Sequence, residues 1–494
     1  MFLARLLVLF SLVCISCAHS SFEQKQLKHA LDFATSNRLE LEILLQHYTY
    51  DSLKLEAAKF LIRNMPHCYS YQQGGEMDSV KRVRTYYSPF GQIDQTYARR
   101  WGHYTYRNLP KIYDAHIITA EYLIDNIDRA FDNWQKRPWN RSLSFEDFCE
   151  YLLPYRIGDE PLEEWRELYE KKYGYLLDSI YKGGDVVEAA NLVSRHLQEP
   201  VFIYCEDFEL PHIGPRYLFS HRYGSCVDAA DIVTYAFRAV GIPCMEDTDA
   251  RGGHVWNVVR DTTGRDVPIW YIASEAVRGS RDTGGYKRGK VYRPMYGFQE
   301  EKAAHLGDDW KSMPLLFYHP YMKDVSYAYY PDTLRILTGI PDDEVCYLAH
   351  FHEAHWWSCA CARSASGKME IPNLESELVY LPMKYTKGNY YPSGFPFWFA
   401  GGEINTFLPD WEKTVKVRLY RKYPVYGWLR SFMGHVVGGT FEGSMTKNFE
   451  DGKTLYEIAD TPVIARNRIF LNKPVKCRYI RYKACLLYTS DAAD

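Results

Sequence analysis

The feature that most constrains this chain is a cysteine placed where a helix is predicted to begin. Ser225 and Asp228 have the spacing of an N-cap residue and its third helical residue, so the helix is predicted to start at Cys226. Apolar residues follow at helical spacing, and the pattern ends at Gly241, before Pro243. Cys226 is therefore expected in the first helical turn. There the unpaired N–H groups and the helix dipole favour an anion and lower the pKa of a thiol from about 8.5.

A histidine opens a strand that is predicted further along the chain. His254, Trp256 and Val258 are expected on one face of this strand, because its residues alternate with a period of two. The opposite face carries the residues between and after them, Val255, Asn257 and Val259. A strand can present an imidazole to a thiolate at a helix start, and this geometry activates a cysteine nucleophile.

The order of these elements is a cysteine on a helix, a histidine on a strand and an acid on the next strand. It resembles the transglutaminase-like superfamily, which is related to the papain-like proteases. The resemblance covers residues 219–275, with Cys-x-x-x-Ala at 226–230, Arg-x-x-Gly-Ile-Pro at 238–243 and His-x-Trp-Asn at 254–257. It implies an α+β core in which Cys226 attacks an amide carbonyl, His254 moves protons and an acidic residue orients His254.

The acidic residue has several candidates. The family usually places an aspartate on the strand after the histidine strand, and here that strand has no aspartate at the expected place. Glu275 is the nearest acid beyond Trp270, so the resemblance implies that Glu275 accepts the imidazole Nδ1–H. Asp266 before the strand and Asp282 after it are the alternatives.

The oxyanion that forms in such a reaction needs hydrogen-bond donors. The backbone N–H of Cys226 is expected to supply one of them. His221 and Tyr223 lie just upstream and are candidates for the second, and the sequence does not choose between them. Trp256 is a further candidate for the lining of the cleft.

The N-terminal residues have the pattern of an export signal. Arg5 precedes an apolar run over residues 6–15 that is too short to span a bilayer. Residues 1–17 are therefore predicted to be a signal peptide, and Ser16-Cys17 resembles a lipoprotein cleavage site that leaves Cys17 as the lipidated N-terminus. Cleavage after Ala18 is the alternative. Residues 485–494 resemble a translated sequencing adapter and are left out of the fold prediction.

The chain of 494 residues is long enough for several domains, and its 46% hydrophobic and 24% charged residues are ordinary for globular proteins. Residues 22–180 are predicted to be helical, with helices over residues 53–64, 112–134 and 144–153. This region resembles the helical leader that precedes a transglutaminase-like core in certain bacterial surface proteins. The core is predicted over residues 181–300, with a helix over residues 186–197.

The remaining part is predicted to be β-rich. Short alternating segments predict a β-sandwich over residues 310–430, with strands at 335–337, 345–351, 378–382 and 415–419. Residues 431–484 contain Arg-Tyr-Ile-Arg-Tyr at 478–482 and resemble part of a discoidin-like (F5/8 type C) jelly roll, in which such a segment is a closing strand. This family binds sugars or braces neighbouring domains. The predicted fold class is therefore multidomain α+β: a helical N-terminal region, a transglutaminase-like α+β core, a β-sandwich and a partial β jelly roll.

A second group of chemically active side chains lies in the β-rich part, at His350, His352, Glu353, His355, Cys359 and Cys361. These residue types suit zinc, but the spacing is not that of His-Glu-x-x-His, and the segment is typical of a strand that leads into a hairpin. We expect no metal and no cofactor. The cysteines show no disulfide-framework spacing, so most are expected to be buried thiols.

Together these patterns predict an exported cysteine hydrolase or acyltransferase that acts on peptide or glycopeptide amides through Cys226, His254 and Glu275. The alternative is a non-catalytic surface scaffold that binds glycan or protein. The expected partners are a peptide or glycoprotein substrate, a glycan at the C-terminal domain, and the membrane through a lipid anchor alone. A net charge of −3 argues against nucleic acid. The expected location is the bacterial outer membrane or cell surface, with the periplasm or the medium as the alternative.

Overall fold

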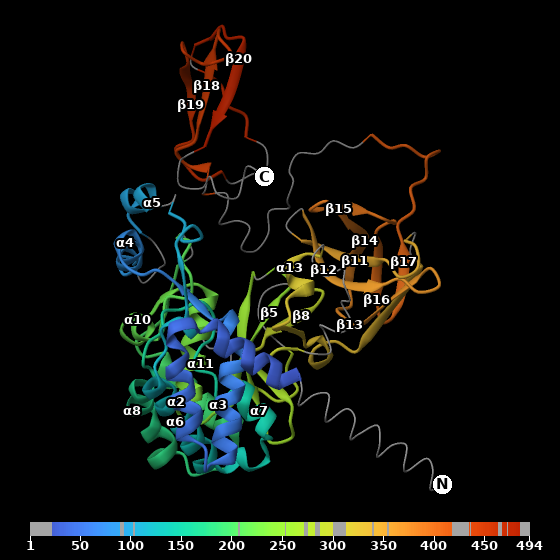
Figure 1. Cartoon of the computed structure of the whole chain (residues 1–494). Coiled ribbons are helices and arrows are strands. Elements are labelled where there is room, and N and C mark those ends of the chain that lie inside the picture. The colour runs from blue at the N-terminus through green and yellow to red at the C-terminus, as the bar shows by residue number, and fades with distance from the viewer. Residues whose placement is uncertain are drawn as a thin grey trace. The chain divides into compact units, whose positions relative to one another are not determined.

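The computed structural model describes residues 22–88, 93–101, 104–205, 208–251, 253–270, 275–281, 287–299, 313–337, 340–352, 355–416, 434, 436–462, 467–471 and 473–484. Within these residues the fold is mixed α+β, and its several sheets are all open (Figure 1). This confirms the α+β class that the sequence predicts. The chain forms two compact units. The first comprises Met1–Gln92, Thr105–His350 and Trp357–Phe407, and the second comprises Ile93–Tyr104, Phe351–Trp356 and Leu408–Asp494.

The first unit begins with a group of helices, as predicted for residues 22–180. They are a helix over residues 22–33, α2 (Arg38–His47), α3 (Ser52–Asn64), α4 (Gly75–Arg84), α6 (Ala120–Lys136), α7 (Phe145–Tyr151) and α8 (Arg166–Tyr175). Asp51, Thr119 and Ser144 each accept a hydrogen bond from a backbone N–H of the first turn and so cap α3, α6 and α7. Helices α3 and α7 therefore confirm the helices expected over residues 53–64 and 144–153.

The helix predicted over residues 112–134 begins later than expected. β2 (Lys111–Tyr113) pairs antiparallel with β1 (Tyr69–Tyr71), and Asp114–His116 forms a 3-10 turn, so that α6 starts at Ala120. The buried carboxylate of Asp114 explains the difference. It accepts a hydrogen bond from Tyr155 Oη at 2.9 Å and is paired with the Arg156 guanidinium, and these long-range contacts hold the segment outside the helix.

α7 carries a half-buried carboxylate, that of Glu150, whose ionisation costs stability. Glu150 accepts hydrogen bonds from the backbone N–H groups of Tyr296 at 3.0 Å and Gly297 at 3.1 Å. Burial nevertheless dominates and raises the pKa of Glu150 to about 7. An unfolded chain releases this proton near a pH of about 4.3. The folded protein therefore loses stability as the pH rises from about 4.3 to about 7, and the loss levels off above that range.

Glu150→Gln keeps a carbonyl oxygen for the two N–H groups and removes the charge. We expect the variant and the wild type to unfold at similar temperatures near pH 4, and the variant to unfold at a higher temperature near pH 8. Thermal unfolding followed by circular dichroism across this range measures the difference. Glu146→Gln, at an exposed position of the same helix, is the matched control. An unchanged pH dependence in Glu150→Gln would contradict the assignment.

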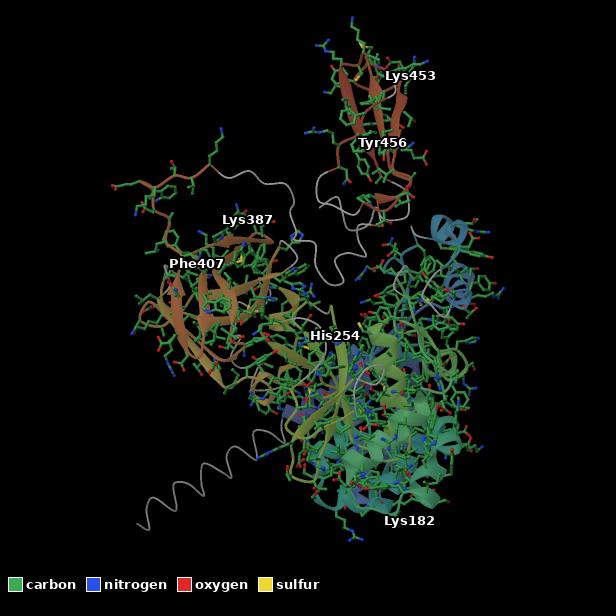
Figure 2. All side chains as sticks on the ribbon, turned by 180° about the vertical axis from the view of Figure 1, so that it is seen from behind. Lys182, His254, Lys387, Phe407, Lys453 and Tyr456 are labelled. Atoms are coloured by element: carbon green, nitrogen blue, oxygen red, sulfur yellow. The ribbon has the colours of Figure 1, made fainter. Side chains whose placement is uncertain are left out.

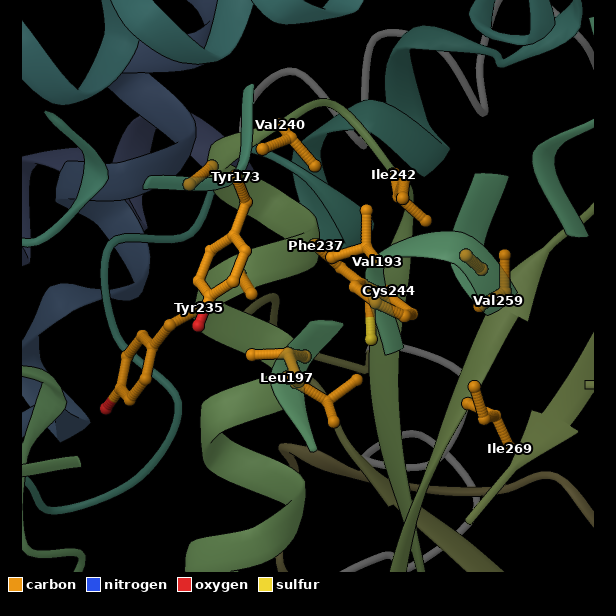
Figure 3. Packing of buried hydrophobic residues seen from close by; sticks show 14 of the residues in the cluster. Tyr173, Val193, Leu197, Tyr235, Phe237, Val240, Ile242, Cys244, Val259 and Ile269 are labelled. Atoms are coloured by element: carbon orange, nitrogen blue, oxygen red, sulfur yellow. The ribbon is translucent and has the colours of Figure 1, made fainter. Parts of the chain in front are cut away.

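A five-stranded antiparallel sheet lies at the centre of the first unit. Its order is β7-β6-β5-β8-β9, with β5 (Cys244–Asp249), β6 (Val255–Arg260), β7 (Asp266–Ile269), β8 (Val291–Pro294) and β9 (Met322–Asp324). One face packs against α9 (Val186–Leu197) and α11 (Cys226–Ala239), where Val193, Phe237 and Val259 meet (Figure 3). The other face packs against Tyr151 and Tyr329. Both faces of the sheet are therefore buried, and α9 coincides with the helix predicted over residues 186–197.

Short elements connect α9 to α11. β3 (Ile203–Tyr204) pairs in parallel with β4 (Tyr223–Gly224), and α10 (Pro215–Ser220) lies between them in sequence. The cluster on the α11 face also contains Trp139, Trp165 and Tyr173, which come from the N-terminal helical region. That region and α11 therefore share one hydrophobic core.

The later part of the first unit consists of strands in two sheets. β10 (Asp332–Leu337) pairs with β13 (Lys368–Leu374), and the second sheet has the order β12-β11-β14-β16-β17 with β15 on β14. The bounds are β11 (Val345–His352), β12 (His355–Arg363), β14 (Leu378–Thr386), β15 (Asn389–Pro392), β16 (Phe397–Ala400) and β17 (Glu403–Thr406). Both sheets contribute to one cluster that includes Leu334, Leu348 and Phe399. A further short helix, α13 (Leu315–Tyr318), precedes them.

Three of the four strands predicted in this region are present, as β10, β11 and β14. The strand predicted over residues 415–419 is not confirmed, because residues 415–416 are not in a strand and residues 417–419 lie outside the described residues.

The second unit contains a three-stranded antiparallel sheet. Its order is β19-β18-β20, with β18 (Thr440–Ser444), β19 (Lys453–Glu457) and β20 (Tyr479–Lys483), and α5 (Gln95–Trp101) also belongs to this unit. β20 contains most of the Arg-Tyr-Ile-Arg-Tyr segment that the sequence predicts as a strand. Among the helices of the described residues, none has the length and apolar character that a membrane span requires.

Candidate active site

The helix that carries Cys226 begins where the sequence predicts. Ser225 is the N-cap of α11, and Asp228 completes a capping box by accepting from the Ser225 backbone N–H at 2.8 Å. Gly224 makes room for this arrangement, because a Cβ at residue 224 would lie 2.3 Å from the Asp228 side chain. Cys226 is 6% exposed and is not part of a disulfide. Its thiol therefore sits in the first turn, where the helix dipole favours a thiolate.

α11 and β6 run in the same direction, so their first residues lie at the same end of the helix–sheet layer. β5 follows α11 and returns along it, and β6 is antiparallel to β5. Side chains fix the alignment: Asn257 Nδ2 donates to Ala230 O at 3.0 Å and to Thr234 Oγ1 at 2.9 Å. Cys226 lies one helical turn before Ala230, and His254 immediately precedes β6. The two candidate residues therefore occupy matching ends of neighbouring elements.

The backbone of His254 is anchored by the end of β5. Its carbonyl oxygen accepts hydrogen bonds from Thr248 Oγ1 at 3.0 Å and from the Asp249 N–H at 3.4 Å. The Asp249 carboxylate in turn accepts from the backbone N–H groups of Arg251 and Gly253, each at 2.9 Å. These bonds close the β5–β6 connection directly before the imidazole.

The His254 ring lies against two tryptophans. Its centroid is 4.5 Å from that of Trp270, edge to face, and 5.6 Å from that of Trp256 (His254 is labelled in Figure 2). Trp256 packs on the sheet face away from α11, whereas Asn257 contacts α11, so the alternation predicted for these residues within β6 is confirmed. Trp270 packs against the clusters on both faces of the sheet. The imidazole is therefore half-buried beside a side chain that reaches both faces.

The acids proposed as partners of His254 have other contacts. Glu275 Oε1 accepts from Arg195 Nη1 at 2.6 Å in a half-exposed ion pair, and this is its hydrogen-bond partner among the described residues. Asp266 accepts from Tyr151 Oη at 3.0 Å and pairs with Arg293 at 2.8 Å. Asp282 lies outside the described residues. The structure therefore does not bring Glu275 or Asp266 to the imidazole through a described contact.

The three oxyanion and cleft candidates differ in their environments. Tyr223, in β4, is half-buried next to the cap of α11. His221 is exposed, and its ring packs on that of Tyr217 at 4.7 Å. Trp256 is fully buried, and its indole N–H donates to Tyr329 Oη at 2.9 Å. Trp256 thus contributes to the core beneath His254, and Tyr223 lies nearest in the chain to the thiol.

A charged contact at the helix start is absent from the sequence prediction. Arg84, the last residue of α4, donates from Nη1 to Asp228 Oδ2 at 2.9 Å, and both side chains are 4% exposed. Arg84 Nη2 also donates to the Phe208 carbonyl at 3.1 Å. No local sequence signal indicates this pair, because Arg84 and Asp228 are 144 residues apart.

The other cysteines provide an internal comparison for Cys226. The nine cysteines that the structure describes are outside disulfides. Burial raises the pKa of the Cys244 thiol to about 12 and that of Cys346 to about 11. Cys17, the predicted lipidation site, lies outside the described residues.

The histidine- and cysteine-rich segment forms strands, as expected. His350 and His352 lie on β11, His355 and Cys359 lie on β12, and Glu353 lies outside the described residues. Cys359 is buried and its Sγ contacts the Leu348 carbonyl at 3.4 Å. Within the described part of the chain, no cluster of three or more histidine, cysteine, aspartate or glutamate side chains could hold a metal ion.

Comparison of the chain with protein-family models, with curated proteins and with solved structures finds no match.

Proposed function

We propose that the protein is an exported, transglutaminase-like cysteine hydrolase or acyltransferase with Cys226 as the nucleophile and His254 as the general base. One observation carries the proposal: α11 and β6 run in the same direction, and Cys226 and His254 stand at their matching ends. The capping box supports it, because it fixes the start of α11 at the thiol. The anchored backbone of His254 supports it as well, because a general base must be held in place.

The chemistry proceeds through an acyl-enzyme. His254 accepts the thiol proton, the Cys226 thiolate attacks the amide carbonyl, and a C–S bond forms as the oxyanion develops. His254 then returns the proton to the leaving amine, the C–N bond breaks, and a thioester remains. Water or a second amine attacks the thioester and releases the acid or the new amide. The backbone N–H of Cys226 and a donor near Tyr223 are proposed to stabilise the oxyanion.

The substrate class proposed is a peptide or glycopeptide amide. In the same proposal, residues 181–300 form the transglutaminase-like core, residues 310–430 a β-sandwich and residues 431–484 part of a discoidin-like jelly roll that binds a glycan or braces its neighbours. The two sheets around one cluster in the first unit support the sandwich. Export with a lipid anchor at Cys17 completes the proposal, so that the enzyme acts at a bacterial surface.

Alkylation by iodoacetamide, followed at each cysteine by mass spectrometry between about pH 6 and pH 8, tests the proposal. We expect Cys226 to react faster than Cys244 and Cys346, because the raised pKa values of those two thiols leave very little thiolate near pH 7. His254→Ala is expected to lower the alkylation rate of Cys226 about tenfold, because the thiolate loses its ion-pair partner. Alkylation of Cys226 no faster than that of the buried thiols would overturn the proposal.

A second function, a non-catalytic binding scaffold, is favoured by one contact. Glu275, the acid that the resemblance implies for His254, pairs with Arg195 instead, and a transglutaminase-like fold can serve as a framework alone. Glu275→Gln separates the two roles in the same experiment. If Glu275 orients His254, the variant should lower the rate at which Cys226 is alkylated. If Glu275 only forms the ion pair with Arg195, that rate should stay unchanged. A slow Cys226 in the wild type would direct the next assay to glycan binding.

A further inference from the structure

The charge next to Cys226 is balanced by a residue from the N-terminal helical region. Arg84 and Asp228 form a buried ion pair, and burial weakens the screening that water gives at a surface. The same Asp228 oxygen, Oδ2, accepts from Arg84 Nη1 and from the Ser225 N–H. A single atom therefore links the guanidinium to the residue that precedes the nucleophile.

α4 is held against the segment that leads into α11, so this contact is built into the fold. Tyr217 Oη, in α10, donates to the Lys81 carbonyl at 2.8 Å. Lys81 Nζ donates to the Ile213 carbonyl at 3.3 Å and to Gln73 Oε1 at 2.7 Å. These bonds are made by Lys81, one helical turn before Arg84, and they hold the end of α4. Among the described residues, the buried Arg84 Nε atom has no hydrogen-bond partner, so the two Nη groups make the described hydrogen bonds of the guanidinium.

Asp228 has opposite effects on the nucleophile. Its hydrogen bond to the Ser225 N–H fixes the first turn of α11, which favours a thiolate through the helix dipole. Its negative charge lies two residues from Cys226, which opposes a thiolate by like-charge repulsion. A capping carboxylate is therefore compatible with a reactive thiol when a fixed cation neutralises the charge of the carboxylate.

We infer that Arg84 is a positioning residue for the Cys226 thiolate: it cancels the charge of the capping carboxylate and thereby makes the reactivity of the nucleophile depend on the docking of α4. The inference rests on the proposed function, and it adds control of the nucleophile by the helical region. An uncompensated charge near a thiol shifts the pKa of the thiol by about one unit. About tenfold in alkylation rate near pH 7 is therefore the expected scale.

The test measures the pH midpoint of Cys226 alkylation in full-length variants. Arg84→Met leaves Asp228 negative, so the pH midpoint should rise by about one unit. Arg84→Lys keeps the positive charge, so its midpoint should lie close to that of the wild type. Asp228→Asn keeps an acceptor for Ser225 and leaves Arg84 positive, so the midpoint should fall. A merely structural ion pair predicts a different outcome, because both Arg84→Met and Asp228→Asn break it and should shift the midpoint in the same direction.

Arg82→Met is the matched control, since it removes the same charge from an exposed position on α4. Thermal unfolding of each variant shows that it is folded, and Asp228→Asn carries the test if Arg84→Met does not fold. Shifts in the same direction, or no shift in either variant, would overturn the inference while a fast Cys226 in the wild type upholds the proposed function. A wild-type Cys226 that reacts no faster than Cys244 would overturn both.

Discussion

Arg293→Met is expected to lower the free energy of unfolding by about 3–5 kcal/mol, because it removes the cation paired with the buried carboxylate of Asp247 and leaves Asp266 with Arg260 alone. Arg293, on β8, donates from Nε and Nη2 to Asp247 at 2.5 and 2.9 Å and pairs with Asp266 at 2.8 Å. The three side chains are at most 3% exposed. Burial already raises the pKa of Asp247, so loss of Arg293 makes its charged form still less favourable. Urea unfolding at pH 7 measures the loss.

Two comparisons isolate this effect. Arg335→Met breaks the Arg335–Glu370 pair, whose side chains are 67% and 58% exposed, and should cost less than about 1 kcal/mol. Adding Asp247→Asn to Arg293→Met removes the charge that has lost its cation and should recover part of the stability. If Arg293→Met costs no more than Arg335→Met, the buried network does not carry the stability assigned to it.

This network also explains why Asp266 is a poor candidate for the acid that orients His254. It joins β5, β7 and β8 to Tyr151, whose hydroxyl group contacts both Asp266 and Arg293. The network covers the sheet face on which Trp256 packs, and Tyr329 connects the two by contacting Asp247 at 2.6 Å and Trp256 at 2.9 Å. The role of the network is therefore to support the buried residues, including Trp256, that pack next to His254.

The parts of the site that the sequence predicts are those encoded by neighbouring residues. The start of α11 follows from Ser225 and Asp228, and the faces of β6 follow from its alternation, because capping and strand pleating act over a few residues. The helix α9 follows in the same way from its apolar spacing. Local patterns of this kind are sufficient to place Cys226 at the start of α11 and His254 at the start of the β6 segment, although β6 itself begins one residue later, at Val255.

Contacts between distant segments could not be predicted from the sequence. Arg84 reaches Asp228 across 144 residues, and Glu275 pairs with Arg195 across 80. Neither pairing leaves a signal in spacing or composition. The late start of α6 has the same origin, since the contacts of Asp114 with Tyr155 and Arg156 override the helical pattern. The motif makes Trp256 a candidate for the lining of the cleft, and the structure buries its side chain in the core next to the His254 ring.

The N-terminal helical region also holds the other end of α11. The last carbonyl groups of a helix have no partner within the helix. Here the carbonyl of Ala239 accepts from Asn133 at 3.0 Å, that of Val240 from Arg137 at 2.8 Å, and that of Gly241 from Trp139 Nε1 at 2.9 Å. All of these donors belong to the N-terminal helical region. Removal of that region would therefore expose these carbonyl groups or leave them without hydrogen-bond partners.

Removal of this region is therefore expected to abolish cooperative folding of the rest. A protein of residues 181–407 keeps α11 and the complete five-stranded sheet but lacks Arg84, the donors at the end of α11, and the aromatic residues that complete its hydrophobic cluster. Each buried polar group left without a partner costs about 1–3 kcal/mol, so several such losses, added to the lost hydrophobic contacts, are comparable to the usual stability of a domain, about 5–15 kcal/mol. We expect residues 181–407 to lack a cooperative thermal transition by circular dichroism.

Residues 22–407 provide the matched comparison, because the two proteins differ in the helical region alone, and this longer protein should unfold cooperatively. A single substitution gives an independent measurement in the full chain. Gly241 has a φ of +82°, and a Cβ there would lie 2.8 Å from both Arg137 Cγ and the Asn133 carbonyl, so Gly241→Ala should destabilise the protein by more than the about 1 kcal/mol of backbone strain alone. Cooperative unfolding of residues 181–407 near the unfolding temperature of the longer protein would show that the core folds without the N-terminal helical region.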